Sequence, residues 1–143
     1  MIGVLFIGTS MAQGKKSTPA EAEAMVKKAI VFLKANGKEK AFAAFSDKNG
    51  KFVAGELYIF VYDLTGKCVA HGGNAKMIGK DLIDMKDADG KSFVKERLEI
   101  IKSKGKGWQN YKWNNPANGK IEDKTAYIEK SGDVIIGCGA YKK

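Results

Sequence analysis

The sequence has few of the side chains that build most metal and catalytic centres. It holds one histidine, His71, and two cysteines, Cys68 and Cys138, that lie far apart in the chain. One imidazole and two distant thiols do not match the ligand spacing of a zinc site, and no C-x-x-C-H segment offers haem attachment. The G-x-S-x-G, G-x-x-x-x-G-K-[ST] and H-E-x-x-H signatures are also absent. These absences argue against an enzyme, and we expect no metal and no cofactor.

Arginine is almost missing too, although the chain is basic. The formal net charge is +9, and Arg97 is the only arginine, so lysine carries nearly all of the positive charge. Base-edge readout and bidentate phosphate contacts depend on arginine forks, which argues against sequence-specific nucleic-acid recognition. The lysines are spread along the chain, as is typical of a solvated basic surface. Binding to an anionic polymer stays open as an alternative.

The chain has one uncharged apolar run, MIGVLFIGTSMA, at its N-terminus. The run is too short to span a bilayer as a helix. It ends in small residues, Ser10 and Ala12, which is the pattern before a signal-peptidase cut, but it lacks the positive region of a full signal peptide. We therefore expect residues 1–12 to be a signal peptide, complete or truncated, and the protein to be periplasmic or secreted. A buried N-terminal strand is the alternative.

Helical signals follow this run. Thr18 suits an N-cap, Pro19 suits the first helical position, and Glu21 completes a capping box. Asn36-Gly37 suits a left-handed cap at the helix end. A second, short helix is expected before the turn at residues 47–50.

The period then changes from helical to alternating. Residues 57–62 carry apolar side chains on both faces, which predicts a strand that is covered on both sides. Gly66 supplies the positive φ of a tight turn, and residues 67–71 return as the second strand of a hairpin. We expect a loop at residues 72–90, an amphipathic helix at residues 91–104 and three more strands at residues 108–113, 124–129 and 134–141. The first of these three strands places Gln109, Tyr111 and Trp113 on one face.

This element order predicts one α+β domain over residues 17–143. Antiparallel strands joined by hairpins, with helices on one side, make this class of fold. No internal repeat and no linker divides the chain. We expect a PAS-like five-stranded antiparallel sheet with a long N-terminal helix and a helical crossover.

Four stretches add a family resemblance by their order and spacing. They are YIFVYDLTGKCVAH, MIGKDLIDMKDADGKSFV, GWQNYKWNNPANGKIEDKTAY and VIIGCGAY. From about residue 20 onward the chain resembles a single Cache domain of the second type, an extracytoplasmic PAS-like module. The resemblance implies a pocket between the sheet and the crossover, for a small organic acid, amino acid or related metabolite. Without a second hydrophobic segment the chain is similar to the stand-alone exported form, which would signal through a membrane receptor or by self-association.

The same resemblance bears on the cysteines, which an oxidising compartment would allow to pair. In the strand order of the family the first strand lies between the second and the fifth, and these two carry Cys68 and Cys138. Two strand spacings separate them by roughly 9.5 Å, beyond the roughly 7 Å Cα limit for a disulfide. We therefore expect two free thiols.

The candidate ligand site combines aromatic walls with a few polar groups. A small-molecule pocket needs mainly apolar walls with convergent polar groups, and aromatic side chains with polar tips supply both. A carboxylate between a lysine ammonium and tyrosine or histidine donors gains charge-assisted hydrogen bonds. The resemblance adds the K-x-x-Y pattern of Cache pockets, which Lys124 and Tyr127 match. The candidate residues are Tyr58, Phe60, Tyr62, His71, Trp108, Tyr111, Trp113, Lys124 and Tyr127.

Two alternatives stay open. A regular strand places Lys124 and Tyr127 on opposite faces, so either a bulge intervenes or only one of them lines the pocket. Aromatic residues on a sheet also suit a filled core. The sequence therefore leaves two functions, namely a module that binds a small carboxylate-type ligand, or a structural or protein-interaction domain with a filled core and no ligand.

Overall fold

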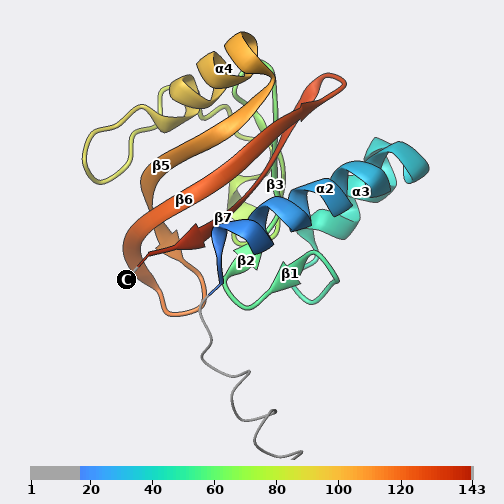
Figure 1. Cartoon of the computed structure of the whole chain (residues 1–143), viewed down its shortest axis with the longest axis horizontal. Helices are drawn as coiled ribbons and strands as arrows, with labels where there is room; N and C mark the ends of the chain where they lie inside the picture. Colours follow the sequence, from blue (N-terminus) through green and yellow to red (C-terminus); the bar gives the residue numbers. More distant parts are fainter. Residues whose placement is uncertain (1–16, 143) are drawn as a thin grey trace, which may run out of the picture.

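The computed structural model describes residues 17–142 (Figure 1), and the predicted signal peptide at residues 1–12 lies outside them. Within the described part, no helix combines the length and the apolar character that crossing a membrane requires. The elements in chain order are α2 (Pro19–Asn36), α3 (Lys38–Ser46), β1 (Val53–Ala54), β2 (Leu57–Tyr58), β3 (Phe60–Asp63), β4 (Cys68–His71), the 3₁₀ turn η1 (Ala75–Met77), α4 (Phe93–Lys104), β5 (Lys106–Asn115), β6 (Lys120–Ser131) and β7 (Val134–Tyr141).

The first helix begins and ends where the sequence predicts. The Thr18 hydroxyl accepts the backbone N–H of Glu21, and the Glu21 carboxylate accepts the backbone N–H of Thr18, so the capping box is complete. Gly37 ends α2 as predicted, but with a φ of 84° and a ψ of 167° it has a positive φ without the left-handed helical conformation that the sequence predicted, and it directly precedes α3. Because these signals are local, they could be read from the sequence without knowing the fold.

Strands β3 to β7 form one antiparallel sheet in the order β4-β3-β7-β6-β5, which confirms the predicted α+β fold. One predicted strand is divided: the chain breaks at Ile59, so that β2 pairs with β1 in a small separate hairpin while β3 enters the main sheet. The β5–β6 hairpin is longer than its apolar pattern predicts, since backbone pairing continues through polar positions as far as Asn115 and Lys120.

The two faces of the sheet have different covers. Helix α2 packs on one face, here called the α2 face, with Ile59, Val61 and Ile136 among the side chains beneath it. Helix α4 and the crossover (residues 72–92) cover the opposite α4 face. The prediction that helices lie on one side is therefore wrong. The reason is that β2 and β3 carry apolar side chains on both faces, and both faces must be removed from water.

The two cysteines are free and buried, as the strand order implied. Cys68 on β4 faces α4, and Cys138 on β7 faces α2. Strand β3 lies between them. Both the separation and the opposite orientation keep the thiols apart.

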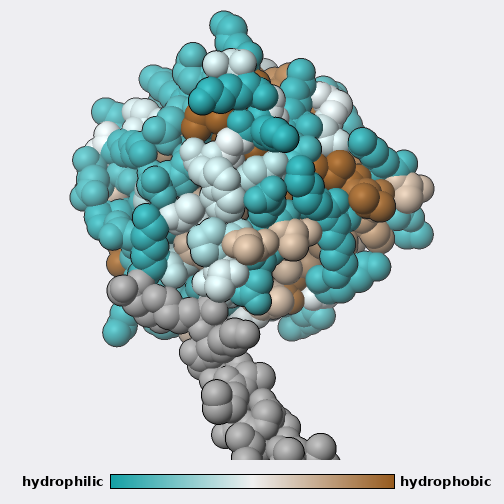
Figure 2. All heavy atoms as spheres, viewed as in Figure 1, coloured by the Kyte–Doolittle hydropathy of each residue, from teal (hydrophilic) through white to brown (hydrophobic). Residues whose placement is uncertain are grey.

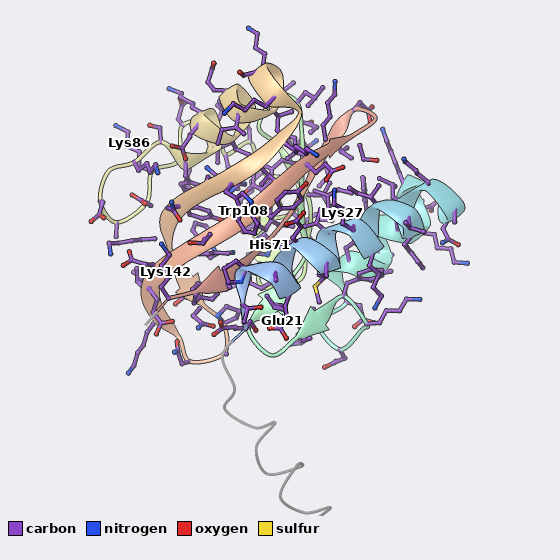
Figure 3. The ribbon with its side chains drawn as sticks, viewed as in Figure 1. Glu21, Lys27, His71, Lys86, Trp108 and Lys142 are labelled. Carbon is purple, nitrogen blue, oxygen red and sulfur yellow. The ribbon has the colours of Figure 1, made fainter. Side chains whose placement is uncertain are left out.

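The surface around this core is mostly hydrophilic on the face shown in Figure 2, with small hydrophobic patches. The charged side chains are spread around the molecule rather than gathered in one region (Figure 3). Surface ion pairs such as Lys27–Glu129 and Lys38–Asp133, each 2.7 Å long, tie helices α2 and α3 to the β6–β7 hairpin. Exposed pairs of this kind stabilise a fold only weakly.

Candidate functional site

Seven of the nine predicted site residues lie together on the α4 face. Strands β2 and β3 contribute three aromatic side chains, and the ring of His71 at the end of β4 lies beside them, 5.0 Å from the Tyr58 ring and 6.4 Å from the Phe60 ring. Strands β5 and β6 contribute the rest from the other half of the sheet. The seven residues are Tyr58, Phe60, Tyr62, His71, Tyr111, Trp113 and Lys124.

The structure places the other two, Trp108 and Tyr127, on the α2 face. Their rings pack together with centroids 5.2 Å apart, and Lys27 of α2 lies over the Tyr127 ring. The Tyr127 hydroxyl donates to Glu129 on this face. Strand β6 pairs in continuous register with both neighbours. Because no bulge intervenes, Lys124 alone of the K-x-x-Y pair faces the site.

Lys124 is a buried cation. Its side chain is 1% exposed, and its Nζ donates a 2.8 Å hydrogen bond to the Tyr58 hydroxyl. The ammonium also lies 5.1 Å from the centre of the Phe60 ring and 5.6 Å from that of Tyr111. Burial lowers the pKa of Lys124 from 10.5 to about 7. The side chain can therefore gain or lose its proton near neutral pH.

A glycine in β7 makes room for this lysine. A Cβ on Gly139 would lie 2.6 Å from Lys124 Cε and 2.9 Å from the Thr125 carbonyl oxygen. Gly137, two residues earlier on the same face, makes room for the Phe60 ring in the same way. The two glycines of VIIGCGAY thus form a shallow floor on which the aliphatic chain of Lys124 and the Phe60 ring lie flat.

The hydroxyl groups beside Lys124 are already committed. The Tyr141 hydroxyl donates to the Asn114 carbonyl oxygen at 3.0 Å, and it lies 3.2 Å from the Tyr58 hydroxyl. Because the Tyr141 hydroxyl donates its single proton to Asn114, the Tyr58 hydroxyl must donate to the Tyr141 hydroxyl oxygen and accept the bond from Lys124 Nζ. Burial raises the pKa of both tyrosines, so they stay protonated. The remaining N–H bonds of Lys124 are the unused donors of this chain of hydrogen bonds.

Arg97 is a second buried cation that the sequence reasoning missed. It projects from α4, is 1% exposed, and its guanidinium carbon lies 4.5 Å from the Phe60 ring centre and 4.7 Å from that of Tyr62. Its Nε donates to Gln109 Oε1 at 2.7 Å. Among the described residues, Arg97 Nη1 is the buried side-chain nitrogen or oxygen without a hydrogen-bond partner. The sequence did contain a sign that Arg97 faces inward, because this residue lies four positions after Phe93 on the apolar face of its helix.

His71 completes the polar set as a neutral donor. Its Nδ1 accepts the backbone N–H groups of Gly73, at 3.1 Å, and Asn74, at 2.8 Å, so the ring proton is assigned to Nε2. Burial, and then the nearby positive charges of Lys124 and Arg97, lower the pKa of His71 to about 3. The imidazole is therefore uncharged at physiological pH.

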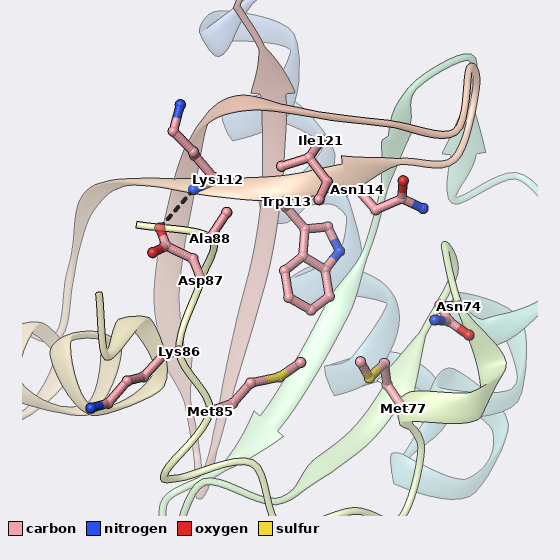
Figure 4. A pocket seen from close by; sticks show the side chains of 10 residues that line it. All are labelled: Asn74, Met77, Met85, Lys86, Asp87, Ala88, Lys112, Trp113, Asn114 and Ile121. Carbon is pink, nitrogen blue, oxygen red and sulfur yellow. Dashed lines mark hydrogen bonds between the residues drawn. The ribbon is translucent and has the colours of Figure 1, made fainter. Parts of the chain in front are cut away.

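Two surface cavities of about 360 Å³ each flank this buried cluster. In the first, the Trp113 indole points between Met77 and Met85 of the crossover (Figure 4). The Trp113 ring also packs against Phe93, 5.3 Å away, which in turn contacts Arg97. The second cavity is polar and reaches Tyr111 and Lys124. Asp87 and Lys112 line both cavities.

The chemistry of the cluster suits an anion. It combines two buried cations and a neutral N–H donor with aromatic walls, and no ion pair joins either cation to a carboxylate within residues 17–142. A metal is a poor fit, because the described residues contain no group of three or more His, Cys, Asp and Glu side chains that could hold one.

Comparison with known proteins agrees with this architecture. The Single Cache domain 2 family matches residues 4–143. This chain is also similar to two curated proteins over 86 residues, or 59% of its length. It is 31% identical to the sensor histidine kinase MctS of Rhizobium johnstonii and 33% identical to the methyl-accepting chemotaxis protein McpP of Pseudomonas putida. The matched part spans only 18% and 16% of those two proteins.

Solved structures show the same fold. The periplasmic sensor domain of a chemotaxis protein is 23% identical, with a TM-score of 0.74 over 87% of this chain and 95% of that chain. A Cache chemosensory domain, solved to explain carboxylic acid recognition, is 24% identical, with a TM-score of 0.73 over 100% of this chain and 99% of that one. This chain therefore belongs to the single Cache domain 2 family, whose members are non-catalytic sensor domains of chemoreceptors and histidine kinases.

Proposed function

We propose that this Cache domain senses a small carboxylate, held on the α4 face between Arg97 and Lys124. These two buried cations, on one aromatic face and without an ion-pair partner among the described residues, carry the proposal. Removing an unpaired charge from water costs several kcal/mol. A fold keeps such a charge when a function requires it, and a bound carboxylate offsets the cost by supplying the missing partner.

The spare donors describe the ligand. Arg97 Nη1, the unused N–H bonds of Lys124 and the His71 N–H suit a group with several acceptor lone pairs. Both cations lie against the Phe60 and Tyr111 rings, and these apolar surroundings suit an acid with a short apolar body rather than a second charged group. The carboxylic acid recognition described for a Cache domain of the same fold supports this ligand class.

We further propose that the domain works in the periplasm or outside the cell, as the periplasmic sensor domain with this fold does. In this proposal it passes ligand binding to a membrane receptor or to a second copy of itself. The match to parts of a histidine kinase and of a chemoreceptor supports a role in signal transduction.

A panel of short acids tests the proposal by thermal shift and calorimetry. The probes are acetate, propionate, lactate and succinate, added to protein that has been unfolded, dialysed and refolded to remove any ligand from the host. We expect stabilisation by at least one acid, and its loss in Lys124→Ala, Arg97→Gln and His71→Ala. Lys112→Ala is the matched control, because this lysine is on a neighbouring strand but pairs with Asp123 at the surface.

Three results would contradict the proposal. If no acid changes the melting temperature of the refolded protein, the filled-core interaction domain is the better description. If the acids stabilise the protein equally in the three variants, they bind elsewhere. If the protein instead binds polyanions in a strongly salt-dependent way, the basic surface carries the function.

A further inference from the structure

Access to the buried site requires a part of its cover to move. Arg97 and Lys124 are each 1% exposed, while the two cavities beside them open on the surface. Helix α4 is firmly held, since Val94 and Ile101 are buried and the Gln109 side chain donates to the Phe93 carbonyl oxygen and to Glu96. The crossover is the other part of the cover on this face.

The first half of the crossover is bonded to β4 through its backbone. The N–H of Cys68 donates to the Lys80 carbonyl oxygen at 2.9 Å, and the N–H of Gly79 donates to the Cys68 carbonyl oxygen at 2.7 Å. The N–H of Leu82 donates to Gly66 in the same way. These bonds make residues 79–82 an extension of the sheet edge, so this half is not the moving part.

The second half, residues 84–92, is held mainly through side chains. One carboxylate oxygen of Asp87 organises the local turn by accepting the N–H groups of Asp89 and Lys91. The other oxygen accepts the backbone N–H of Lys112 on β5 at 2.9 Å (Figure 4). Lys91 Nζ adds a bond to the Asn110 carbonyl oxygen. Strand β5 is an edge strand, so its outward N–H groups are free to take such a partner.

The bond between Asp87 and Lys112 lies where the two cavities meet, because both residues line both of them. Trp113 of the first cavity and Tyr111 of the second lie on the same strand, and the Tyr111 ring contacts both Arg97 and Lys124. We propose that residues 84–92 are a lid, that the Asp87 carboxylate latches it to the N–H of Lys112, and that release of this latch joins the cavities and exposes the ligand site. Leu82 and Phe93, both anchored, bound the moving segment.

Amide hydrogen exchange in the absence of any ligand tests the latch with paired variants of one residue. Lys112→Pro removes the N–H that Asp87 accepts, at an outward-facing position of an edge strand, where proline is tolerated. Lys112→Ala removes the same side chain and keeps the N–H. We expect residues 84–91 to exchange about tenfold faster in the proline variant, the factor expected for a hydrogen bond to a charged group. Exchange in α2 and β7 should stay unchanged.

A second pair of variants tests the acceptor of the same hydrogen bond, the Asp87 carboxylate. Asp87→Ala should accelerate exchange in the same segment, and Lys86→Ala, an exposed position in that segment without an ion pair among the described residues, should not. Equal exchange in Lys112→Pro and Lys112→Ala would overturn the proposal. Faster exchange across the whole domain would overturn it as well, since the contact would then support the fold rather than a local opening.

The role of the lid in ligand access rests on the proposed function. It is tested separately, by the rate at which a ligand associates. The association rate of acetate, followed by tryptophan fluorescence, should rise in Lys112→Pro relative to Lys112→Ala. An unchanged association rate in a variant with faster lid exchange would place the access route elsewhere. If the wild-type protein binds no acid, the proposed function fails, while the exchange comparison still decides whether the lid exists.

Discussion

The ammonium of Lys124 donates a 2.8 Å hydrogen bond to the hydroxyl of Tyr58, which is 66 residues earlier in the chain. The lysine reaches this partner by passing over Gly139 in the neighbouring strand β7. A hydroxyl oxygen satisfies one N–H of the ammonium but does not neutralise its charge. The ligand-free domain therefore contains a buried amine, with a pKa of about 7, that is surrounded by rings and one hydroxyl and that feels the charge of the buried Glu56 without a salt bridge to it. Several consequences can be measured.

Replacing Lys124 by methionine should stabilise the ligand-free domain. Methionine fills a similar volume without a buried charge, so we expect a gain of about 1–4 kcal/mol in the free energy of unfolding at pH 7. The pKa of Lys124 falls from 10.5 to about 7 on folding. Between those values the unfolded chain binds more protons, so wild-type stability rises with pH in this window, and the variant should lose that rise. Urea unfolding at about pH 7 and pH 9 measures both effects, with Lys112→Met as the control. A variant less stable than wild type at pH 7 would show that the charge is compensated.

Acid binding should weaken as the pH rises above about 7. A carboxylate beside Lys124 favours its charged form and raises its pKa, so binding takes up a proton wherever the free lysine is neutral. The affinity for acetate should then fall by up to about tenfold per pH unit between pH 7 and 9. His71, with a pKa of about 3, does not titrate in this window. Calorimetry in two buffers of different ionisation enthalpy detects the proton uptake, and a constant affinity would rule out Lys124 as the partner.

The site should prefer a plain acid to the amino acid of the same carbon skeleton. The α-ammonium of alanine would be a third positive group beside Arg97 and Lys124, and the acceptor nitrogen of His71 is already used by two backbone N–H groups. Like charges in a buried site repel by several kcal/mol, so we expect propionate to bind at least about tenfold more tightly than alanine. Equal affinities in a calorimetric comparison would mean that a carboxylate reaches the ammonium in the bound state.

Two tyrosine-to-phenylalanine variants should separate the two faces of the sheet. Tyr58→Phe removes the oxygen that orients Lys124 and should weaken acid binding by about tenfold, the worth of a hydrogen bond to a charged group. Tyr127→Phe removes only a bond to Glu129 on the α2 face and should leave the affinity unchanged. Each variant keeps its ring, so packing is preserved. An equal loss in both variants would show that the effect passes through the stability of the sheet.

The floor of the site should not tolerate a methyl group at Gly137. A Cβ there would lie 2.3 Å from two atoms of the Phe60 ring, so the ring or the strand must shift. Overpacking of this kind costs about 1–3 kcal/mol of stability. We expect Gly137→Ala to lower the melting temperature and to weaken acid binding together. A variant with wild-type stability and affinity would show that Phe60 can move without consequence.

Much of the fold followed from local patterns. The capping box at Thr18 depends on side-chain hydrogen bonds three residues apart, and Gly37 and Gly66 adopt a positive φ that few residues tolerate, so each signal is visible in a short stretch. The alternation of Tyr58, Phe60 and Tyr62 also survives the break at Ile59. The same alternation placed Tyr111 and Trp113 on one face of their strand, which leaves Trp108 on the other, although Trp108 was also named as a site candidate.

Arg97 shows why the site was incompletely predicted. Its spacing from Phe93 placed it on the inner face of its helix, but an arginine there is expected to extend to the surface. Whether it is buried depends on what packs above it, and that is decided by Gln109 on β5 and by the rings of β3. Tyr141 was missed for a similar reason, since its partner Asn114 is reached only after the β5–β6 hairpin folds back on β7.

The sequence by itself determined the order of helices and strands, the positions of the turns and the residues that share a strand face, because caps, positive φ angles and a period of two are local properties. The tertiary structure alone decided that Arg97 of α4 and Lys124 of β6 face the same ring, without an ion pair to any carboxylate of residues 17–142. The packing of a helix on one face of a sheet brings together groups that no sequence spacing connects. The unpaired charge that makes this face a candidate ligand site is a property of that packing.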